Sequence, residues 1–186
     1  MPYSNPDGAP IGLYQGMEAT PTQNYTEINS KKGEQQYIQL ALTLTAGTTT
    51  KIAFTTGSKP VLVKQRDFSA RGEQVSIQIF KAPTGVTGGT PVSVQNFNDR
   101  NPVTGSVVVR SGVTTTTNGV SWGDPQTIYG VNQQSQRVGQ IISSGAERVL
   151  AANKTYLIVI TNGTGDSTCE YFLSFREGDT DYPRLQ

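Results

Sequence analysis

The sequence predicts an all-β protein: an antiparallel β-sandwich, jelly-roll-like, with an extended N-terminal arm. Three observations lead to this fold class. Thr, Gly and Pro are abundant, with 24 Thr, 20 Gly and 10 Pro among 186 residues, a composition that favours short strands and turns over helices. Several segments alternate apolar and polar residues with the period of two that is typical of a strand with one buried face. No segment has the apolar spacing of an amphipathic helix.

The first 34 residues differ from the rest of the chain. They are rich in Pro and Gly, and their apolar residues are scattered without a period of two or 3.6. This pattern predicts an extended arm over residues 1–34. Such an arm buries little of itself, so we expect it to contact a neighbouring subunit, an assembly surface or its own domain; a free terminus is the alternative. The candidate interface residues of the arm are Ile11, Leu13, Tyr14, Met17 and Tyr25.

Residues 35–178 are predicted to form the sandwich domain, and residues 179–186 a short C-terminal tail. The expected strands are 37–44, 50–55, 61–68, 74–81, 92–94, 107–110, 155–161 and 169–176. The segments 140–142 and 148–150 are expected to be strand ends. We expect loops at 82–90 and 111–136, the second with one short strand at 127–131.

Alternation also predicts which side chains face the core. In the first and fourth strands these are Ile38, Leu40, Leu42 and Leu44, and Val75, Ile77 and Ile79. In the third strand, alternation places Lys64 and Arg66 together on a solvent-facing side. Cys169 heads a strand and is expected to be a small core residue.

The composition weighs against several classes of function. The chain has no His and a single Cys, so His-based catalysis, His-ligated metal sites and an intrachain disulfide are excluded. A net charge of +1 gives no broad electrostatic reason to bind nucleic acid. The purely apolar runs are far shorter than the ~18 residues needed to cross a membrane, and the N-terminus lacks the pattern of a secretory signal. We expect no cofactor, no metal, no nucleic acid and no membrane partner.

Two motifs that could indicate catalysis have simpler interpretations. The Gly-rich stretch Gly85–Gly89 lacks the GK[ST] ending of a phosphate loop and precedes no helix, so it is expected to be a loop between strands. Four carboxylates lie near the C-terminal end: Glu170, Glu177, Asp179 and Asp181. The three in the polar tail, Glu177, Asp179 and Asp181, are expected to be solvated rather than to form a catalytic pair. Calcium coordination is the weaker alternative, because their spacing matches no calcium loop. The sequence therefore predicts a protein that is not an enzyme.

Two further places in the chain are candidate contact sites. In the turn Asn98-Asp99-Arg100, Asp99 is expected to cap nearby backbone N–H groups, while Asn98 and Arg100 could belong to an interface, because Arg is enriched at interface hot spots. Trp122, the only Trp, lies in a polar loop. It could cover an edge of the sandwich, anchor a subunit interface or stack on a sugar.

The order of several short motifs resembles a family of small virion structural proteins of tailed bacteriophages. The motifs are a Thr-rich stretch at Leu44–Thr50, an alternating strand ending in Phe80–Thr84, Gly88–Pro91, the Asn-x-Asn-x-Arg turn Asn96–Arg100, Asn153–Asn162, and the aromatic strand Tyr171–Phe175. These lie between Tyr37 and Glu177 and span about three quarters of the chain.

This resemblance implies a capsid decoration (cement) protein, a β-sandwich that binds the assembled major capsid protein on the outer surface of the head and stabilises it. It also implies a virion protein without catalytic residues, made in the host cytoplasm. A homotrimer would suit a threefold position of a capsid, and the arm would join subunits. The alternative is a tail-fibre, head-fibre or baseplate module that recognises host glycan through Trp122 or Tyr129.

Overall fold

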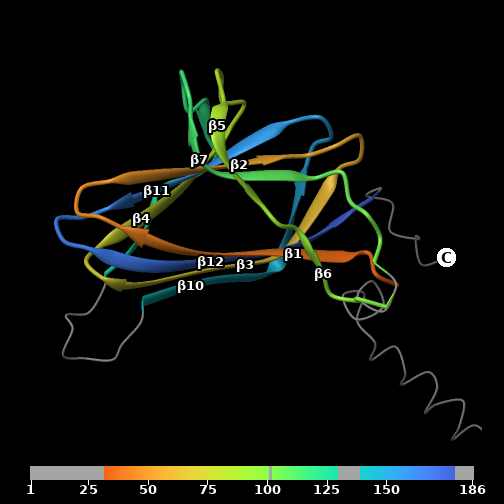
Figure 1. Ribbon diagram of the computed structural model, residues 1–186, viewed down its shortest axis with the longest axis horizontal. Helices are drawn as coiled ribbons and strands as arrows, with labels where there is room; N and C mark the ends of the chain where they lie inside the picture. The colour runs from red at the N-terminus through yellow and green to blue at the C-terminus, as the bar shows by residue number, and fades with distance from the viewer. Residues whose placement is uncertain (1–31, 101, 130–138, 179–186) are drawn as a thin grey trace, which may run out of the picture.

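The computed structural model describes residues 32–100, 102–129 and 139–178. These residues form two antiparallel β-sheets stacked in two layers (Figure 1), with no helix among them. In the same described ranges, no helix is long and apolar enough to cross a membrane. The predicted all-β, antiparallel sandwich is confirmed.

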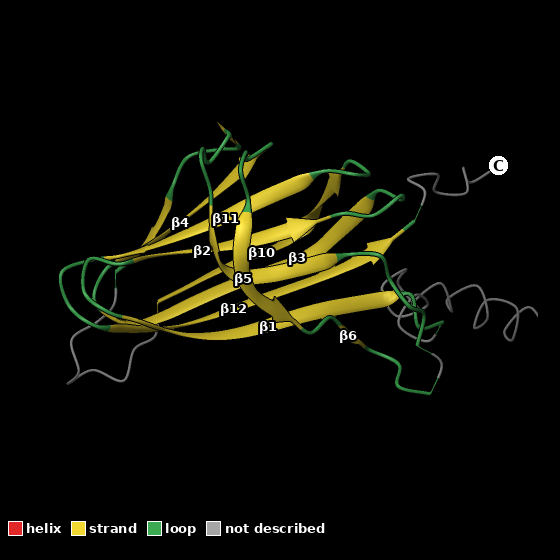
Figure 2. Ribbon diagram, turned by 45° about the horizontal axis from the view of Figure 1, so that its top comes forward, coloured by secondary structure: helices red, strands yellow, loops and turns green. Residues whose placement is uncertain are grey.

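The first layer is a five-stranded sheet. Its strand order, from one edge to the other, is β10 (Gly139–Leu150), β3 (Val61–Gly72), β12 (Ser167–Glu177), β1 (Gln35–Leu44) and β6 (Gln95–Asn96). The two long strands β1 and β12 pair along their lengths, from Gln35 opposite Arg176 to Leu44 opposite Ser167. The short strand β6 continues the sheet beyond β1 (Figure 2).

The second layer is a seven-stranded sheet. Its order is β5 (Thr87–Val92), β7 (Val108–Thr114), β2 (Thr49–Thr55), β11 (Thr155–Asn162), β4 (Val75–Lys81) and β8 (Val120–Ser121), with β9 (Gln126–Ile128) also paired to β4.

The strand pairing is that of a jelly roll. The four pairs β1 with β12, β2 with β11, β3 with β10 and β4 with β9 are all antiparallel. The chain therefore forms one long hairpin of four strands leading out and four leading back. This hairpin rolls up so that the pairs alternate between the two sheets, which is the topology of a two-sheet jelly roll.

One long connection adds further strands to these eight paired strands. Residues 82–125 join β4 to β9 and contain β5, β6, β7 and β8. Within this connection β7 pairs with β2 and β6 pairs with β1, so it widens both sheets along the same side of the sandwich.

The core lies between the two sheets. Phe54 of β2 meets Phe175 of β12 edge to face, with ring centroids 5.2 Å apart, and Ile38, Phe68 and Ile160 are fully buried around them. Burial of each such side chain contributes about 1.5–3 kcal/mol. Of the residues expected to face inward, Ile38, Leu44, Val75 and Ile77 are buried, while Leu40, Leu42 and Ile79 are partly buried against the same core.

A second, smaller apolar cluster covers the outer face of the seven-stranded sheet. Ala53, Leu157 and Val159 point outward from β2 and β11 and are buried beneath Val113, with Val86 and Phe80 beside them. The ribbon of β5 and β7 therefore folds over this face. Lys51 Nζ donates to Thr115 Oγ1 at 2.8 Å and joins the ribbon to β2.

The Thr-rich composition has a direct structural use. Hydroxyl groups of cross-strand Thr neighbours hydrogen-bond to one another in four pairs: Thr49 with Thr161, Thr55 with Thr155, Thr84 with Thr117 and Thr87 with Thr114, at 2.8–3.2 Å. Cross-strand pairs of this kind stabilise a sheet by roughly 0.2–1 kcal/mol each. Thr thus supplies both the β-branched shape and the polar links on partly exposed strand faces.

The structure corrects several of the expected loop and strand boundaries. The loop expected at 82–90 is wrong from residue 87 on, because residues 87–92 form β5 by pairing with β7. The loop expected at 111–136 contains the end of β7, residues 111–114, and all of β8. The expected strand at 92–94 is also wrong, since β5 ends at Val92 and β6 begins at Gln95. The two expected strand ends at 140–142 and 148–150 belong to one strand, β10.

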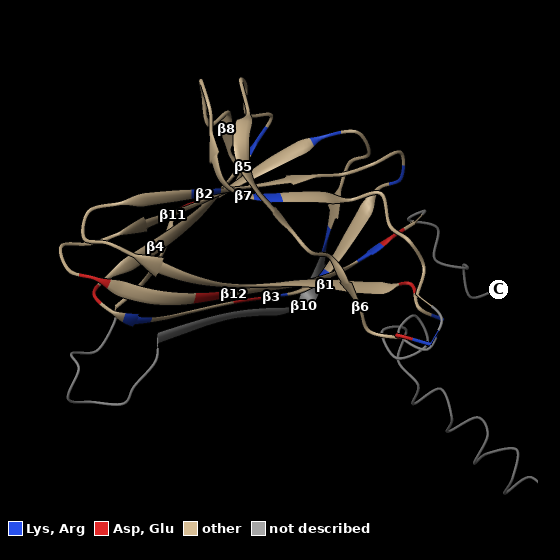
Figure 3. Ribbon diagram, viewed as in Figure 1, with Lys and Arg blue, Asp and Glu red and all other residues tan. Residues whose placement is uncertain are grey.

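Other boundaries differ less. The short strand expected at 127–131 corresponds to β9, Gln126–Ile128. Positions 130 and 131 of the expected strand lie outside the described residues. The tail at 179–186 and most of the arm also lie outside them. Lys, Arg, Asp and Glu residues occur along the chain in both layers (Figure 3).

Candidate functional site

The first candidate site lies where the arm joins the sandwich. Gly33, just before β1, has a carbonyl oxygen that accepts hydrogen bonds from Val103 N at 3.1 Å and Asn96 Nδ2 at 2.5 Å. Phe97 N donates to Gln35 O at 3.1 Å. Asn96, Phe97 and Val103 therefore hold the chain at the point where the predicted arm ends and β1 begins.

The turn after β6 belongs to the same site. Asn96 Oδ1 accepts from Asn98 N at 2.8 Å, and Asn98 Oδ1 accepts from Arg100 N at 3.0 Å. The capping residues are therefore Asn96 and Asn98, two successive Asx turns, and the expectation that Asp99 caps the turn is corrected. Arg100 is exposed.

An aromatic strip borders this turn on the outer face of the five-stranded sheet. The ring of Phe97, 47% exposed, lies 4.8 Å from the ring of Tyr37, which lies 5.8 Å from Phe172. Tyr37 and Phe172 point away from the core because their neighbours Ile38, Tyr171 and Leu173 face inward. Sequence reasoning missed this strip; the available signal was a large aromatic residue between two Asn in a polar turn.

The arm residues proposed for contact fall beyond the structural description. Ile11, Leu13, Tyr14, Met17 and Tyr25 lie outside the described residues. Of the remaining candidates, the structure brings Asn98 and Arg100 to the base of the arm. It places Trp122 at the opposite side of the sandwich, beside β4, whereas Asn98 follows β6 at the far edge of the other sheet.

Trp122 covers the open side between β4 and β10. Its ring lies 5.5 Å from the ring of Tyr156, inclined by 35°. Lys81 Nζ lies 4.0 Å from the Trp122 ring centroid and Arg148 Cζ lies 5.4 Å from it. The side chain is partly buried and packs against the core. This geometry agrees with the first of the three interpretations of Trp122, cover of the sandwich edge.

Arg66 lies near Trp122 and faces the core rather than the solvent side that the sequence predicts. Ser174 pairs with Gln65 and Phe175 with Val63, so Lys64 is an extra, bulged residue in β3. The bulge reverses the alternation and turns Arg66 inward with Phe68, where it is only 8% exposed. Its guanidinium Nη2 donates to Gln126 Oε1. Burial lowers the pKa of Arg66. The expected solvent-facing pair, Lys64 and Arg66, is therefore wrong.

The carboxylates at the C-terminal end do not form one solvated group. Glu177 hydrogen-bonds Ser106 and Val107, which corrects its expected solvation. Glu170 is exposed on β12, while Asp179 and Asp181 lie outside the described residues. Cys169 is buried, as expected. Within the described ranges, no group of three or more Cys, Asp or Glu residues could hold a metal ion.

Comparisons with known proteins give a weak result. No family model matches the chain, and no curated protein matches it. Among solved structures, the VP2 subviral particle of infectious bursal disease virus is 11% identical, with a TM-score of 0.20, over 78% of this chain and 42% of that one. The structure of the Gx strain of the same virus is 13% identical, with a TM-score of 0.15, over 80% and 43%. The chain thus spans less than half the length of either. Likeness at this level does not establish a shared fold.

Proposed function

We propose that this chain is a non-enzymatic structural protein of a bacteriophage virion, a capsid decoration protein that binds the assembled shell and stabilises it. The observation that carries the proposal is the grouping of the arm base, the aromatic strip (Tyr37, Phe97 and Phe172) and the Asn98–Arg100 turn on one edge of the sandwich. The motif order that resembles phage virion proteins supplies the class of partner.

The long connection supports an interaction role for this edge. Most connections in compact domains are short, with a median of about 4–6 residues, whereas this connection is long enough to contain four strands of its own. Here residues 82–125 leave the jelly roll intact and add β6, Phe97 and Arg100 beside the start of β1. Phe and Arg are both enriched at protein–protein interfaces, and Phe97 and Arg100 are both exposed here.

The arm fits the same role. It joins the domain beside the aromatic strip, so a subunit bound through that strip could also engage the arm. Contact through a segment of the extended form that the sequence predicts for residues 1–34 would add contact area without a larger core. The major capsid protein and a second copy of this chain are the proposed partners, with a homotrimer on the outer surface of the head as the proposed assembly.

Deletion of the arm tests this proposal. Residues 1–31 should be removed, and Lys32–Glu34 kept, because Gly33 accepts two hydrogen bonds and Glu34 pairs with Arg176 at 3.6 Å. A second variant combines Phe97→Ser with Arg100→Ala. Val120→Ser is the matched control, since Val120 is 69% exposed on β8 at the other side of the sandwich.

The readout is co-sedimentation with capsids of the encoding phage that lack this protein. We expect the deletion and the double variant to remain folded by circular dichroism and to lose most of their capsid binding, while Val120→Ser binds normally. Undiminished binding of both variants would show that this edge is not the attachment site. Binding to host glycan that is lost in Tyr129→Ala, without capsid binding, would favour the tail-fibre or baseplate alternative.

A further inference from the structure

A small cavity lies between the two sheets at the side covered by Trp122. Its volume is about 50 Å³, and much of its wall is apolar, formed by Phe54, Leu150, Ile158 and Leu173. It adjoins an outer hollow of about 220 Å³. The two share four lining residues: Arg66, Ile79, Trp122 and Arg148. This places a route from the surface to the core beside the Trp122 ring.

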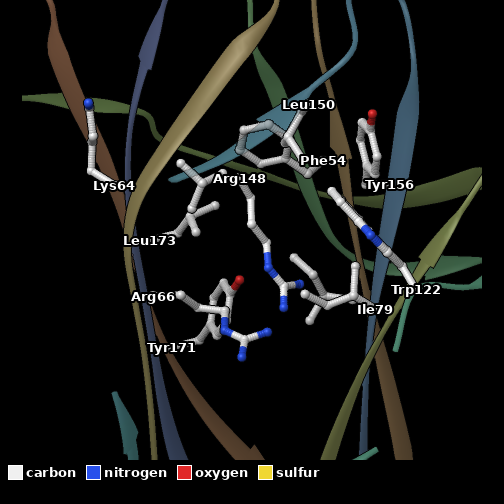
Figure 4. Close-up of a pocket in the computed structure, with 12 residues that line it drawn as sticks. Phe54, Lys64, Arg66, Ile79, Trp122, Arg148, Leu150, Tyr156, Tyr171 and Leu173 are labelled. Atoms are coloured by element: carbon white, nitrogen blue, oxygen red, sulfur yellow. The ribbon is translucent and has the colours of Figure 1, made fainter. Parts of the chain in front are cut away.

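Three hydrogen-bond donors converge on this cavity. The guanidinium groups of Arg66 and Arg148 and the hydroxyl of Tyr171 extend toward one another there (Figure 4). They come from three neighbouring strands, β3, β10 and β12. Tyr171 is 1% exposed, and burial raises its pKa, so the phenol keeps its proton and remains a donor.

Among the residues that the structure describes, the inner cavity offers the two guanidinium groups no carboxylate, and the outer hollow has one, that of Asp124. The hydrogen bond of Arg66 goes to the neutral amide of Gln126. Burial lowers the pKa of Arg66; the nearby Tyr171 acts in the opposite direction, and the charge of Arg148 adds to the lowering. A buried cation beside a second cation is costly unless an anion or strong acceptor accompanies it.

The chemistry of the walls narrows the choice of anion. The planar fork of Arg matches the two oxygens of a carboxylate, whereas phosphate or sulfate presents additional oxygens that the apolar wall could not satisfy. The inner cavity has room for a short alkyl group but not for a sugar or a base. We propose that this cavity binds a small aliphatic carboxylate, with the carboxylate held by Arg66 and Arg148 and the alkyl chain against Leu150, Leu173 and Phe54.

Trp122 makes the proposal measurable, because it is the only Trp in the chain and its ring borders both the cavity and the hollow. The probe is sodium pentanoate, titrated at constant ionic strength against sodium chloride while the emission of Trp122 is recorded. Pentanamide is the neutral probe of the same shape, and sodium phosphate is the competing anion. We expect a saturable change with pentanoate alone, together with an increase in thermal stability from preferential binding to the folded state.

Variants separate this site from general charge effects. Loss of a charged hydrogen bond costs about 1.5–3 kcal/mol, so Arg66→Gln and Arg148→Gln should each weaken pentanoate binding at least about tenfold. Arg148 is exposed at its strand edge, so Arg148→Gln decides the result if Arg66→Gln fails to fold. Arg110→Gln is the control, because Arg110 is exposed on β7 and lines neither the cavity nor the hollow.

Three results would overturn the assignment. The first is no saturable response to pentanoate beyond that to sodium chloride. The second is an equal response to pentanamide or to phosphate, which would remove the carboxylate specificity. The third is an unchanged affinity in a folded Arg148→Gln variant.

Discussion

The carboxylate of Glu177 accepts three hydrogen bonds from Ser106 and its neighbour. Glu177 Oε1 accepts from Ser106 N at 2.7 Å and from Val107 N at 3.0 Å, and Glu177 Oε2 accepts from Ser106 Oγ at 2.6 Å. The contact joins the end of β12 in one sheet to the segment that leads into β7 in the other. It requires Gly at 105, where an added Cβ would lie 2.3 Å from Glu177 Oε1.

Removal of this carboxylate should loosen the long connection from the sandwich. For Glu177→Ala we expect the free energy of unfolding to fall by about 1.5–3 kcal/mol, the range for hydrogen bonds to a charged group. Glu177→Gln keeps one acceptor oxygen and should lose less. The measurement is urea unfolding. Glu170→Ala on the exposed face of the same strand is the control, and an equal loss in both variants would show that the contact is not stabilising.

Asn162 links the ends of three strands through its side-chain amide. Nδ2 donates to Leu44 O at 3.0 Å, to Thr45 O at 2.9 Å and to Gly165 O at 2.7 Å, and the side chain is 4% exposed. Asn162→Asp would replace the donor with an acceptor facing carbonyl oxygens. We expect a loss of at least about 2 kcal/mol at pH 7.

The charge of the substituted carboxylate gives this prediction a second check. Protonation near pH 4 should remove much of the repulsion, so the deficit of Asn162→Asp relative to the parent chain should shrink as the pH falls from 7 to 4. Unfolding in urea at the two pH values measures the difference. A deficit that does not change with pH would show that lost donors, rather than repulsion, account for the effect.

Trp122→Ala should uncover the cavity between β4 and β10. The substitution removes the contact with Tyr156 and the two cation contacts from Lys81 and Arg148. Because the ring is partly buried, we expect a loss of about 1–3 kcal/mol, below the range for a full core truncation. Thermal unfolding followed by circular dichroism measures it. Tyr129→Ala, at a side chain 72% exposed, should change stability by no more than about 0.5 kcal/mol.

The buried thiol of Cys169 predicts a dependence of stability on alkaline pH. Burial raises its pKa from 9.0 to about 11. Because the folded value is the higher one, this contribution to the free energy of unfolding is fully present below pH 9 and is lost as the pH rises toward 11. The parent chain should therefore lose more stability over this window than Cys169→Ala does.

The comparison with Cys169→Ala isolates the thiol, since Tyr171 and the other groups that titrate at high pH are present in both proteins. Urea unfolding in steps between the two pKa values gives the two slopes. Parallel slopes would exclude ionisation of Cys169 as the source of the pH dependence.

The strands that the sequence predicts well have apolar residues that recur along their whole length. The segments 37–44, 74–81, 155–161 and 169–176 match β1, β4, β11 and β12 closely, because their apolar residues pack against the core. In β11 both faces are apolar and buried. The strand β5, with the sequence TGGTPV, has no such face. It forms a strand because it pairs with β7, and the local sequence pattern does not predict a tertiary partner of this kind.

The candidate sites depend on features that local patterns do not encode. One bulge at Lys64 turns Arg66 from the expected solvent face into the core, and a bulge leaves no distinct sequence signal here. Asn98 and Arg100 were found because a polar turn between strands is recognisable. Their position beside Gly33 follows from the pairing of β6 with β1, across more than fifty residues of sequence.

The proposed place of this chain in a virion is tested most directly by cryo-electron microscopy of the intact particle that carries it. We predict density for the two-sheet sandwich on the outer surface of the capsid, with the edge of Phe97 and Arg100 against the shell or a neighbouring copy. Density for the chain at the tail or baseplate, or its absence from the particle, would contradict the decoration role.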